Sequence, residues 1–375
     1  MTRPRILIVG AGIAGLTLTH ALRRNGLYAD IIERSSRFPT TGAGLYLPAN
    51  AVRTVAHLGL GDALARRGHP ITRQRILDHR DRHLATVPVH RVWGDVGACL
   101  ALTRGDMHTI LRDAVGDDNI RLGTGLSALA QDGTATFTDA TTDRYDLVVG
   151  ADGANSTVRQ QAFGAPPPRF LGQICWRFLA RNENHLAHGT DWTVRLGSRG
   201  RSFLTVPLGN GTVYCYADTN SDSPAEPTGD WRSLFEGFAP PVLRLASQGA
   251  TAHFAPLYEA GGSDWVRPHA VLIGDAAHAC SPSMAQGAAM ALEDAHVLAS
   301  MLGTTTWQSA SDPGTLRRVL KEYQLRREAR VRWVLEQNKR RDATRNLPAI
   351  ARNMTLRLFG ARLLKANHAP LRLQP

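Results

Sequence analysis

The chain has 375 residues with ordinary apolar (43%) and charged (20%) fractions, which predicts two packed domains and excludes a disordered or fibrous protein. No apolar run reaches the roughly 18 residues of a membrane span, and a strand pattern begins near the N-terminus, so we expect a cytoplasmic protein without integral membrane association. The net charge of +12 rests on arginines spread along the whole sequence. This favours a solvated surface over a nucleic-acid partner, with steering of an anionic ligand as the alternative.

The first elements form a strand, a helix and a second strand. Residues 6–9 are a continuous apolar run, as expected for a parallel strand buried on both faces. Apolar residues then recur at helical spacing over 13–22, and the helix is expected to end at Asn25. A second apolar strand covers 29–32 and leads into Glu33. About 30 residues in this order are typical of a mononucleotide-binding half.

The middle of the chain changes pattern more than once. Residues 72–101 and 165–255 show short alternating strands with Gly- or Pro-rich turns, which predicts antiparallel sheet. A helix is expected over 106–115. Buried strand patterns return at 145–150 and 271–275, which indicates that the chain comes back to the first sheet.

The C-terminal third is predicted to be helical. A helix over 286–302 is expected to end at Gly303, and a long Arg-rich helix follows a polar stretch and runs to about residue 345. The tail alternates apolar and basic residues. It fits either an interfacial membrane helix or a helix that packs on its own protein, and we favour the second. The apolar residues of this tail are Leu356, Leu358, Phe359, Leu363 and Leu364.

A glycine-rich turn joins the first strand to the first helix. Gly10 allows a tight turn, Gly12 lets the backbone approach a pyrophosphate, and Gly15 allows the helix to pack closely on the strand. The backbone of Ile13 and Ala14 belongs to the same turn. The carboxylate of Glu33, about 20 residues further on, can accept hydrogen bonds from a ribose and would repel a 2′-phosphate. The turn therefore predicts FAD or NAD rather than NADP.

Two further motifs follow in order. The first runs from Asp146 to Arg159 and contains Asp152 and Gly153, and the second is Gly274-Asp-Ala-Ala-His278, followed by Pro282 and Gln286-Gly287. With the glycine-rich turn, these motifs resemble the flavin-dependent aromatic hydroxylases, the single-component FAD monooxygenases of the para-hydroxybenzoate hydroxylase type. The resemblance covers essentially the whole chain.

The resemblance implies an α/β fold in which a Rossmann-like FAD-binding domain holds an inserted, largely antiparallel (α+β) substrate domain and is followed by a C-terminal helix. We expect the FAD-binding domain to be discontinuous. The expected boundaries are 1–70, 102–165 and 256–303 for the FAD-binding domain, 71–101 and 166–255 for the substrate domain, and 304–375 for the C-terminal helical segment.

The resemblance also assigns cofactor roles to individual residues. Asp275 occupies the position that binds the ribityl chain of FAD, and the backbone N–H groups of Gly287 and Ala288 would face the flavin edge that is negative when reduced. Asp152 shapes the turn that closes the site. Arg104 matches an FAD contact.

Two more positions are assigned in the same way. Arg34 resembles an adenosine contact, with a surface ion pair as the alternative for either arginine. Gly42 and Gly44 belong to a turn of small residues beside the flavin ring. Ala285 replaces the first glycine of the usual PxxGQG sequence, which requires a negative φ at this position. We expect a structural role for His278.

The implied activity is an FAD-dependent, NADH- or NADPH-consuming monooxygenation. In the family O₂ adds at flavin C4a, and the hydroperoxide hydroxylates an aromatic or polycyclic small molecule. Tyr46, Trp176 and Arg177 are candidate substrate contacts, with core packing as the alternative for an aromatic residue on a sheet. No metal pattern competes, because the four cysteines lie far apart and are expected to be free thiols. A monomer or a homodimer is expected.

Other functions remain open at this point. Epoxidation or oxidative decarboxylation would use the same flavin chemistry on another bond. A flavin-dependent halogenase shares the FAD domain, but its WxWxIP segment and catalytic lysine are not visible here. A non-catalytic basic protein that retains the FAD fold would lack NAD(P)H oxidation. The sequence leaves the substrate and the choice between NADH and NADPH undecided.

Overall fold

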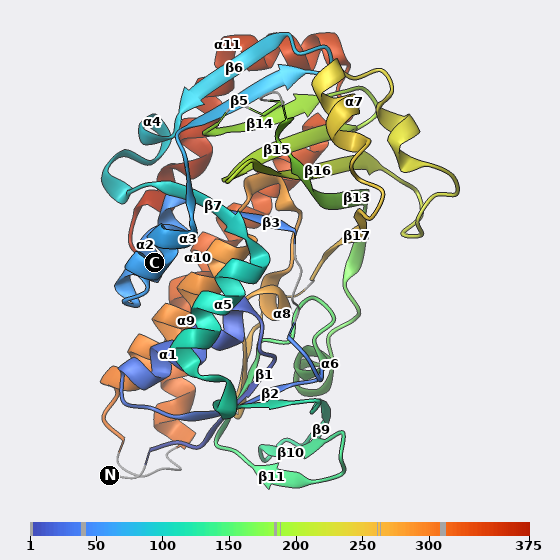
Figure 1. Cartoon of the computed structure of the whole chain (residues 1–375). Coiled ribbons are helices and arrows are strands. Elements are labelled where there is room, and N and C mark those ends of the chain that lie inside the picture. The colour runs from blue at the N-terminus through green and yellow to red at the C-terminus, as the bar shows by residue number, and fades with distance from the viewer. Residues whose placement is uncertain are drawn as a thin grey trace.

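The computed structural model describes residues 3–38, 43–183, 186, 187, 189–260, 262, 264–307 and 313–375. Two large sheets organise this part of the chain, and Figure 1 shows them in opposite halves of the molecule. Among the described helices, none is long and apolar enough to cross a membrane.

The first sheet is the parallel sheet that the sequence predicts. β1 (Ile6–Val9) pairs in parallel with β2 (Ala29–Glu33) and with β12 (Leu147–Gly150), and β12 pairs in parallel with β19 (Ala270–Leu272). Only the short edge strand β18 (Val266–Arg267) of this described sheet pairs antiparallel, with β19. β1 is buried on both faces, which explains its uninterrupted apolar sequence. The spatial order of the strands is β18, β19, β12, β1, β2 and β8 (Ile120–Leu122).

The second large sheet is antiparallel except for the parallel pair β5 and β14. It combines the two segments in which the sequence shows alternating strands, and this confirms the predicted fold class. The strand order is β17 (His253–Glu259), β13 (Arg169–Arg181), β16 (Thr212–Asn220), β15 (Ser202–Gly209), β14 (Asp191–Leu196), β5 (Arg73–Asp78) and β6 (His83–Pro88).

Two smaller sheets complete the strand structure. One joins β3 (Gly44–Leu47), β7 (Cys99–Thr103) and β4 (His69–Ile71) and lies between the two halves in Figure 1. The other is formed by β9 (Leu126–Leu129), β10 (Thr134–Phe137) and β11 (Thr142–Arg144).

Short and medium helices connect the strands in both halves of the molecule, with α4 (Val89–Trp93) and α7 (Pro240–Ala246) in the half that holds the antiparallel sheet. α1 (Ile13–Arg24) packs against α9 (Gly287–Thr304) and α5 (Arg104–Val115). The others are α2 (Ala49–His57), α3 (Gly61–Arg67), α6 (Thr157–Phe163) and α8 (Asp275–His278).

One predicted helix end is wrong, because α9 continues through Gly303 to Thr304. A Cβ atom at Gly303 would lie 2.4 Å from the Cβ atom of Asn25, the residue that ends α1. Gly303 therefore permits close contact between two helices, and its φ angle is not in the left-handed region that ends helices.

Two helices at the C-terminal end cover both sheets. α10 (Pro313–Thr344) packs on α9 and extends toward the antiparallel sheet, where the Arg345 guanidinium lies 2.6 Å from the buried Asp218 carboxylate of β16. α11 (Ala349–His368) then lies along β6, behind β5 and β6 in Figure 1, and contacts α4. The tail helix thus packs on its own protein through one face, as expected.

Candidate active site

A cavity of about 890 Å³ lies where the two halves of the molecule meet. The wall on the side of the parallel sheet comes from the turn between β1 and α1, from α8 and from the first turn of α9. The opposite wall is one face of the antiparallel sheet, and residues of α10 and α11 line a third side. Among the sequence-predicted site residues, those that line it are Gly12, Ile13, Ala14, Gly44, Tyr46, Arg104, Arg177, Asp275, Gly287 and Ala288.

The glycine-rich turn has the shape that the sequence predicts. Gly10 has φ +104°, and a Cβ atom there would lie 2.6 Å from the Ala151 carbonyl oxygen. A Cβ atom at Gly15 would lie 1.9 Å from the Gly10 carbonyl oxygen, whereas the space beside Gly12 is open. Since no side chain caps the N-terminus of α1, its free N–H groups are available to an anion such as a pyrophosphate.

Glu33 lies at the end of β2 and is fixed by the backbone around it. One carboxylate oxygen accepts a hydrogen bond from the Ala11 N–H at 3.0 Å, and the other accepts one from the Ser35 N–H at 2.9 Å. Each oxygen retains a lone pair. The carboxylate is therefore oriented beside the glycine turn, where it can accept a further hydrogen bond from a ribose hydroxyl.

The Asp152 carboxylate binds the N-terminus of α6. It accepts hydrogen bonds from the Ser156 hydroxyl and from the Thr157 N–H, at 2.5 and 2.6 Å. Burial raises the pKa of the Asp152 carboxyl, and these hydrogen bonds only partly offset the rise. Gly153, rather than Asp152, lines the cavity. A cofactor role for Asp152 thus stays a prediction, and its geometry limits that role to shaping the turn.

Arg159 connects the second and third motifs. Its guanidinium is buried and donates hydrogen bonds to the carbonyl oxygens of Ala154 and, at 2.9 Å, of Ala276. The turn after β12 and helix α8 are therefore held together. The sequence motif contains this arginine, but its partner across the fold follows only from the structure.

Asp275 begins α8 and points into the cavity. Its side chain is exposed, and no hydrogen bond to its carboxylate joins it to the described residues. A Cβ atom at Gly287 would lie 4.0 Å from an Asp275 carboxylate oxygen, so the carboxylate lies beside the first turn of α9. That first turn has no side-chain cap and no acidic residue. A free carboxylate and free N–H groups therefore face the same space.

Our expectation for Ala285 is wrong. It has φ +52° and ψ +37°, in the left-handed region, where it ends the 3₁₀ turn Pro282–Met284 (η5) directly before α9. Its N–H donates to the Pro282 carbonyl oxygen at 2.8 Å, which fixes the conformation. A glycine at this position, as in the PxxGQG sequence that the resemblance implies, would adopt this conformation without strain.

Replacing Ala285 with glycine is expected to stabilise the protein. Because a non-glycine residue in the left-handed region costs about 1–2 kcal/mol, we expect Ala285→Gly to raise the free energy of unfolding by about 1 kcal/mol despite the greater chain entropy of glycine. Urea titration followed by circular dichroism measures the change. As a control, Ala299→Gly inside α9 is expected to destabilise by about 1 kcal/mol or more. A destabilised Ala285→Gly variant would contradict the strain assignment.

The other predicted cofactor residues divide between cavity and surface. The Arg104 side chain is exposed at the start of α5 and lines the cavity, and its backbone N–H donates to the Ala43 carbonyl oxygen at 2.9 Å. Arg34 is exposed and does not line the cavity, so its adenosine contact stays a prediction. Gly42 lies outside the described residues.

Gly44 lies where β3 crosses the antiparallel sheet. A Cβ atom at this position would lie 2.3 Å from the Cβ atom of Tyr214 on β16. Contact between the two sheets thus already excludes a side chain at Gly44, independently of any flavin ring. This reason was not visible in the sequence.

Two polar side chains that line the cavity, Tyr46 of β3 and Gln74 of β5, contact each other. The Tyr46 hydroxyl accepts a hydrogen bond from the Gln74 amide nitrogen at 3.3 Å, while the buried Gln74 carbonyl oxygen has no hydrogen-bond partner among the described residues. Arg177 on β13 also lines the cavity and forms no ion pair with a described carboxylate. Tyr46 and Arg177 were predicted from the sequence, whereas Gln74 belongs to no motif and was not.

Trp176 was a candidate substrate contact, but it does not line the cavity. It is fully buried, stacks on Trp231 with ring centroids 5.3 Å apart, and donates a hydrogen bond to Glu226 at 3.1 Å. Because side chains alternate along a strand, Arg177 faces the cavity and Trp176 faces the opposite side of the sheet. Core packing, the alternative stated above, is its role.

A buried charge cluster lies behind the cavity and was missed in the sequence. Glu293 and Asp294 of α9 face Arg327 of α10, whose guanidinium donates to them at 2.9 and 2.8 Å, and all three side chains have 0% exposure. Arg330 adds two hydrogen bonds to Glu293. In the sequence, Arg327 and Arg330 are indistinguishable from the exposed arginines of the same helix.

Asp294 also connects this cluster to α8, the helix that presents Asp275 to the cavity. One Asp294 oxygen accepts a hydrogen bond from the Gly274 N–H at 2.9 Å and lies 2.6 Å from the His278 Nε2 atom. Burial alone would raise the pKa of Asp294, but His278 and Arg327 more than offset this and lower the pKa to about 2. Asp294 thereby fixes both ends of α8, the helix that begins with Asp275.

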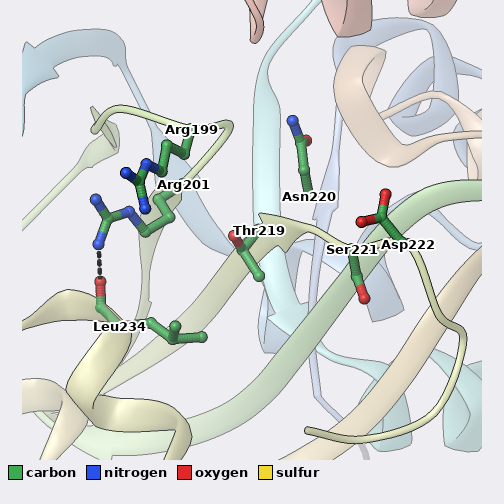
Figure 2. A pocket seen from close by; sticks show the side chains of 7 residues that line it. All are labelled: Arg199, Arg201, Thr219, Asn220, Ser221, Asp222 and Leu234. Atoms are coloured by element: carbon green, nitrogen blue, oxygen red, sulfur yellow. Dashed lines mark hydrogen bonds between the residues drawn. The ribbon is translucent and has the colours of Figure 1, made fainter.

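A second hollow, drawn in Figure 2, lies next to the end of β16 and has a volume of about 290 Å³. Its Arg201 guanidinium already donates to the Leu234 carbonyl oxygen at 2.7 Å, the contact marked in Figure 2, and to Ser198. Asp222 lies on the opposite side of this hollow. Its size and its engaged arginine make it a poor site for a dinucleotide.

Comparisons with known proteins agree with this geometry. The family model described as FAD binding domain matches residues 3–229 and 252–338. Aurachin C monooxygenase/isomerase of Stigmatella aurantiaca is 33% identical over 313 residues, which cover 79% of this chain and 80% of that protein. The 2-heptyl-3-hydroxy-4(1H)-quinolone synthase of Pseudomonas aeruginosa is 32% identical over 349 residues, with coverages of 89% and 87%. The crystal structure of Klebsiella pneumoniae HpxO with FAD and uric acid superimposes with a TM-score of 0.86 at 27% identity and covers 98% of this chain and 96% of that one.

The cavity also passes a direct test of fit to FAD. The glycine turn and its uncapped helix offer N–H groups to a pyrophosphate, Asp275 offers a free carboxylate further along, and the uncapped first turn of α9 offers N–H groups to an electron-rich ring edge. The matched family model spans most of the chain and both sheets. The chain belongs to the flavin-dependent aromatic hydroxylase family and is an FAD-dependent monooxygenase.

Proposed function

We propose that this enzyme oxygenates a planar, oxygen-bearing N-heteroaromatic ring that carries an extended apolar substituent, as in an alkylated 4-quinolone. One observation carries the proposal: the substrate side of the cavity is mainly apolar and contains a small group of polar atoms without protein partners. The apolar lining residues of the sheet and the C-terminal helices include Ile76, Trp192, Val194, Leu196, Leu204, Val206, Leu356, Leu363 and Leu364.

The polar atoms match the edge of such a ring. The unpartnered Gln74 carbonyl oxygen can accept a hydrogen bond from a ring N–H, and the Arg177 guanidinium can donate to a ring oxygen. The Tyr216 hydroxyl is also buried at the cavity, where no strong acceptor among the described residues bonds it and the Cys175 thiol, a weak acceptor, lies beside it. A substrate that forms hydrogen bonds with these groups avoids the free-energy cost of leaving them buried and unpaired, which a purely apolar molecule would incur.

The positive charge of Arg177 would also promote the reaction. A cation beside the ring oxygen favours its ionised form, which increases electron density on the neighbouring ring carbon that receives oxygen. FAD, when bound and reduced by NADH or NADPH, would supply the chemistry that activates O₂, of which one atom is transferred to the ring and the other leaves as water. We assign Arg177 to orienting the ring and Gln74 to fixing its N–H edge.

We infer the following contacts for FAD. Glu33 binds the adenosine ribose, Arg34 lies on the adenosine side, and Arg104 contacts the cofactor from α5. Asp275 accepts a hydrogen bond from the ribityl chain. The N–H groups of Gly287 and Ala288 face the flavin edge that becomes negative on reduction, which the positive end of α9 stabilises. We place the enzyme in the cytoplasm as a monomer or a homodimer.

The relatives support the substrate class in part. The Pseudomonas protein is named for a quinolone with a heptyl chain, and the Klebsiella structure contains uric acid, a small polar heterocycle. The apolar lining contributed by Leu356 and Leu364 of α11 favours the alkylated ring for this chain. Each buried methylene of such a chain contributes about 0.8 kcal/mol.

NAD(P)H oxidation by the purified yellow protein tests the proposal. We compare 2-heptyl-4-quinolone, unsubstituted 4-quinolone and urate with NADH and with NADPH, and identify products by mass spectrometry with ¹⁸O₂. The heptyl compound is expected to stimulate oxidation, to gain one labelled oxygen atom and to have a KM at least about tenfold below that of the unsubstituted ring. A preference for urate would overturn the substrate class. Product structure separates hydroxylation from epoxidation or oxidative decarboxylation.

A pair of arginine variants tests the ring contact. Arg177→Met is expected to raise the KM for the quinolone about tenfold or more while FAD content stays unchanged, since a charged hydrogen bond contributes about 1.5–3 kcal/mol. The control is Arg181→Met, at the exposed end of the same strand, which should match the parent. Equal kinetics for both variants would exclude Arg177 from substrate binding.

A further inference from the structure

The outer face of α11 exposes an unusual amount of apolar surface. Ile350, Met354 and Leu358 follow one another at intervals of four residues, which places them on one stripe of the helix, and they are 85%, 59% and 66% exposed. Phe359 and Leu363 are exposed as well. Six of the eleven large apolar residues that are exposed in the described chain thus lie between Leu347 and Leu363.

The same segment is strongly basic. Residues 343–375 contain six arginines or lysines and no aspartate or glutamate. Three of these, Arg357, Arg362 and Lys365, are exposed on α11 itself, and Arg362 and Lys365 follow the apolar stripe on its side of the helix. Several exposed arginines elsewhere on this protein have acidic partners, as Arg332 does in Glu328.

The inner face of α11 forms part of the cavity. Leu356, Gly360 and Leu364 line it, and Gly360 allows close packing because a Cβ atom there would lie 2.9 Å from the Cβ atom of Ala85 on β6. Leu363, one turn after the exposed Phe359, both lines the cavity and is exposed, so the cavity reaches the surface at one edge of the outer face of α11. One helix therefore separates the substrate space from the exposed apolar face.

We propose that the outer face of α11 binds the surface of an anionic lipid bilayer. Apolar side chains on one face, flanked by cations that can reach lipid phosphates, are the features by which a helix lies in a membrane interface. The absence of acidic residues over this segment provides charge complementarity to anionic lipid. A second copy of the chain fits less well, because a two-fold contact through α11 would bring the same cations together.

The position of this face beside the cavity has a functional consequence, which rests on the proposed function. A ring with a long apolar substituent partitions into lipid. A bilayer at α11 would deliver it next to Leu363, where the cavity meets the surface. The membrane contact would then raise the local concentration of substrate without any helix spanning the membrane.

Vesicle flotation tests the binding directly. The full-length, FAD-loaded protein is mixed with vesicles of phosphatidylcholine alone or with added phosphatidylglycerol. We expect binding to the anionic vesicles, a decrease of at least tenfold in 0.5 M salt, and little binding to neutral vesicles. Leu358→Glu should weaken binding at least tenfold, and replacing both Arg362 and Lys365 with glutamine should weaken it severalfold.

Leu325→Glu is the matched control. Leu325 lies on α10 and is 63% exposed, close to the exposure of Leu358, but it lies outside the α11 face. It should bind vesicles like the parent. FAD content and thermal unfolding of each variant show that the fold is retained.

Two outcomes would overturn the membrane assignment. One is equal vesicle binding by Leu358→Glu and Leu325→Glu, or no binding by the parent. The other is a dimer in sedimentation velocity that Leu358→Glu dissociates, without vesicle binding, which would assign the face to a second copy. Turnover of a water-soluble quinolone without vesicles should be equal in parent and Leu358→Glu. Failure of all quinolones as substrates would contradict the proposed function and leave the vesicle result unaffected.

Discussion

Arg327→Met is expected to lower the free energy of unfolding by about 3–5 kcal/mol, the largest effect that we expect of any single substitution in this protein. The arginine is fully buried and bonds both Glu293 and Asp294. Its removal leaves two buried carboxylates with too little compensating charge, and methionine fills part of the volume without replacing a hydrogen bond. Urea titration of the FAD-loaded protein at pH 7 measures the loss.

The choice of pH follows from Asp294. Its pKa in the folded protein is about 2, below its value in the unfolded chain, so its stabilising contribution is fully present above the unfolded pKa and is lost as the pH falls through about 2. At pH 7 the whole contribution is therefore measured. The control is Arg332→Met on the same helix, where the exposed pair with Glu328 is expected to contribute less than about 1 kcal/mol. Similar unfolding curves for both variants would show that the buried cluster is not a stabilising element.

Loss of FAD binding in Asp275→Ala is the second large effect that we expect. The Asp275 carboxylate has no hydrogen-bond partner among the described residues and faces the cavity beside Gly287. A carboxylate that accepts a hydrogen bond from the ribityl chain contributes about 1.5–3 kcal/mol, so the alanine variant should bind FAD roughly tenfold to a hundredfold more weakly. FAD fluorescence titration of the apoprotein gives the Kd.

Two further variants make the Asp275 test specific. Asp275→Asn keeps the shape and one acceptor oxygen and should retain part of the affinity. Asp222→Ala removes an exposed carboxylate from the small hollow of Figure 2 and should bind FAD like the parent. We also expect the FAD that Asp275→Ala retains to oxidise NAD(P)H with less oxygenated product and more peroxide. Parental affinity and coupling in this variant would remove Asp275 from the cofactor site.

The buried cluster around Arg327 and the Asp275 carboxylate are directly connected. Asp294 accepts a hydrogen bond from the Gly274 N–H, and the next residue is Asp275. The buried cluster therefore positions the turn that presents the Asp275 carboxylate. Because the cluster also holds α9 against α10, it fixes the uncapped first turn of α9 relative to α8. We expect Arg327→Met to weaken FAD binding as well as the fold.

The sequence by itself determined the cofactor half of this protein. Runs of buried strand residues, a glycine turn and an acid at the end of the second strand obey local rules, since each depends on neighbours within about 30 residues. The positions of Gly10, Gly15 and Glu33 therefore followed from spacing alone. The alternating pattern of the substrate sheet was also local, and it predicted an antiparallel sheet without giving its strand order.

Tertiary structure decided the contacts between segments far apart in the chain. Arg327 and Arg332 are the same residue type on one helix, and only the packing of α9 makes the first a buried ion-pair partner. Trp176 and Arg177 are adjacent, and only the placement of the sheet decides which one faces the cavity. The left-handed Ala285 was equally hidden, and the sequence left open which residues of the tail helix are exposed, because burial and backbone conformation at one residue depend on elements that the local sequence does not specify.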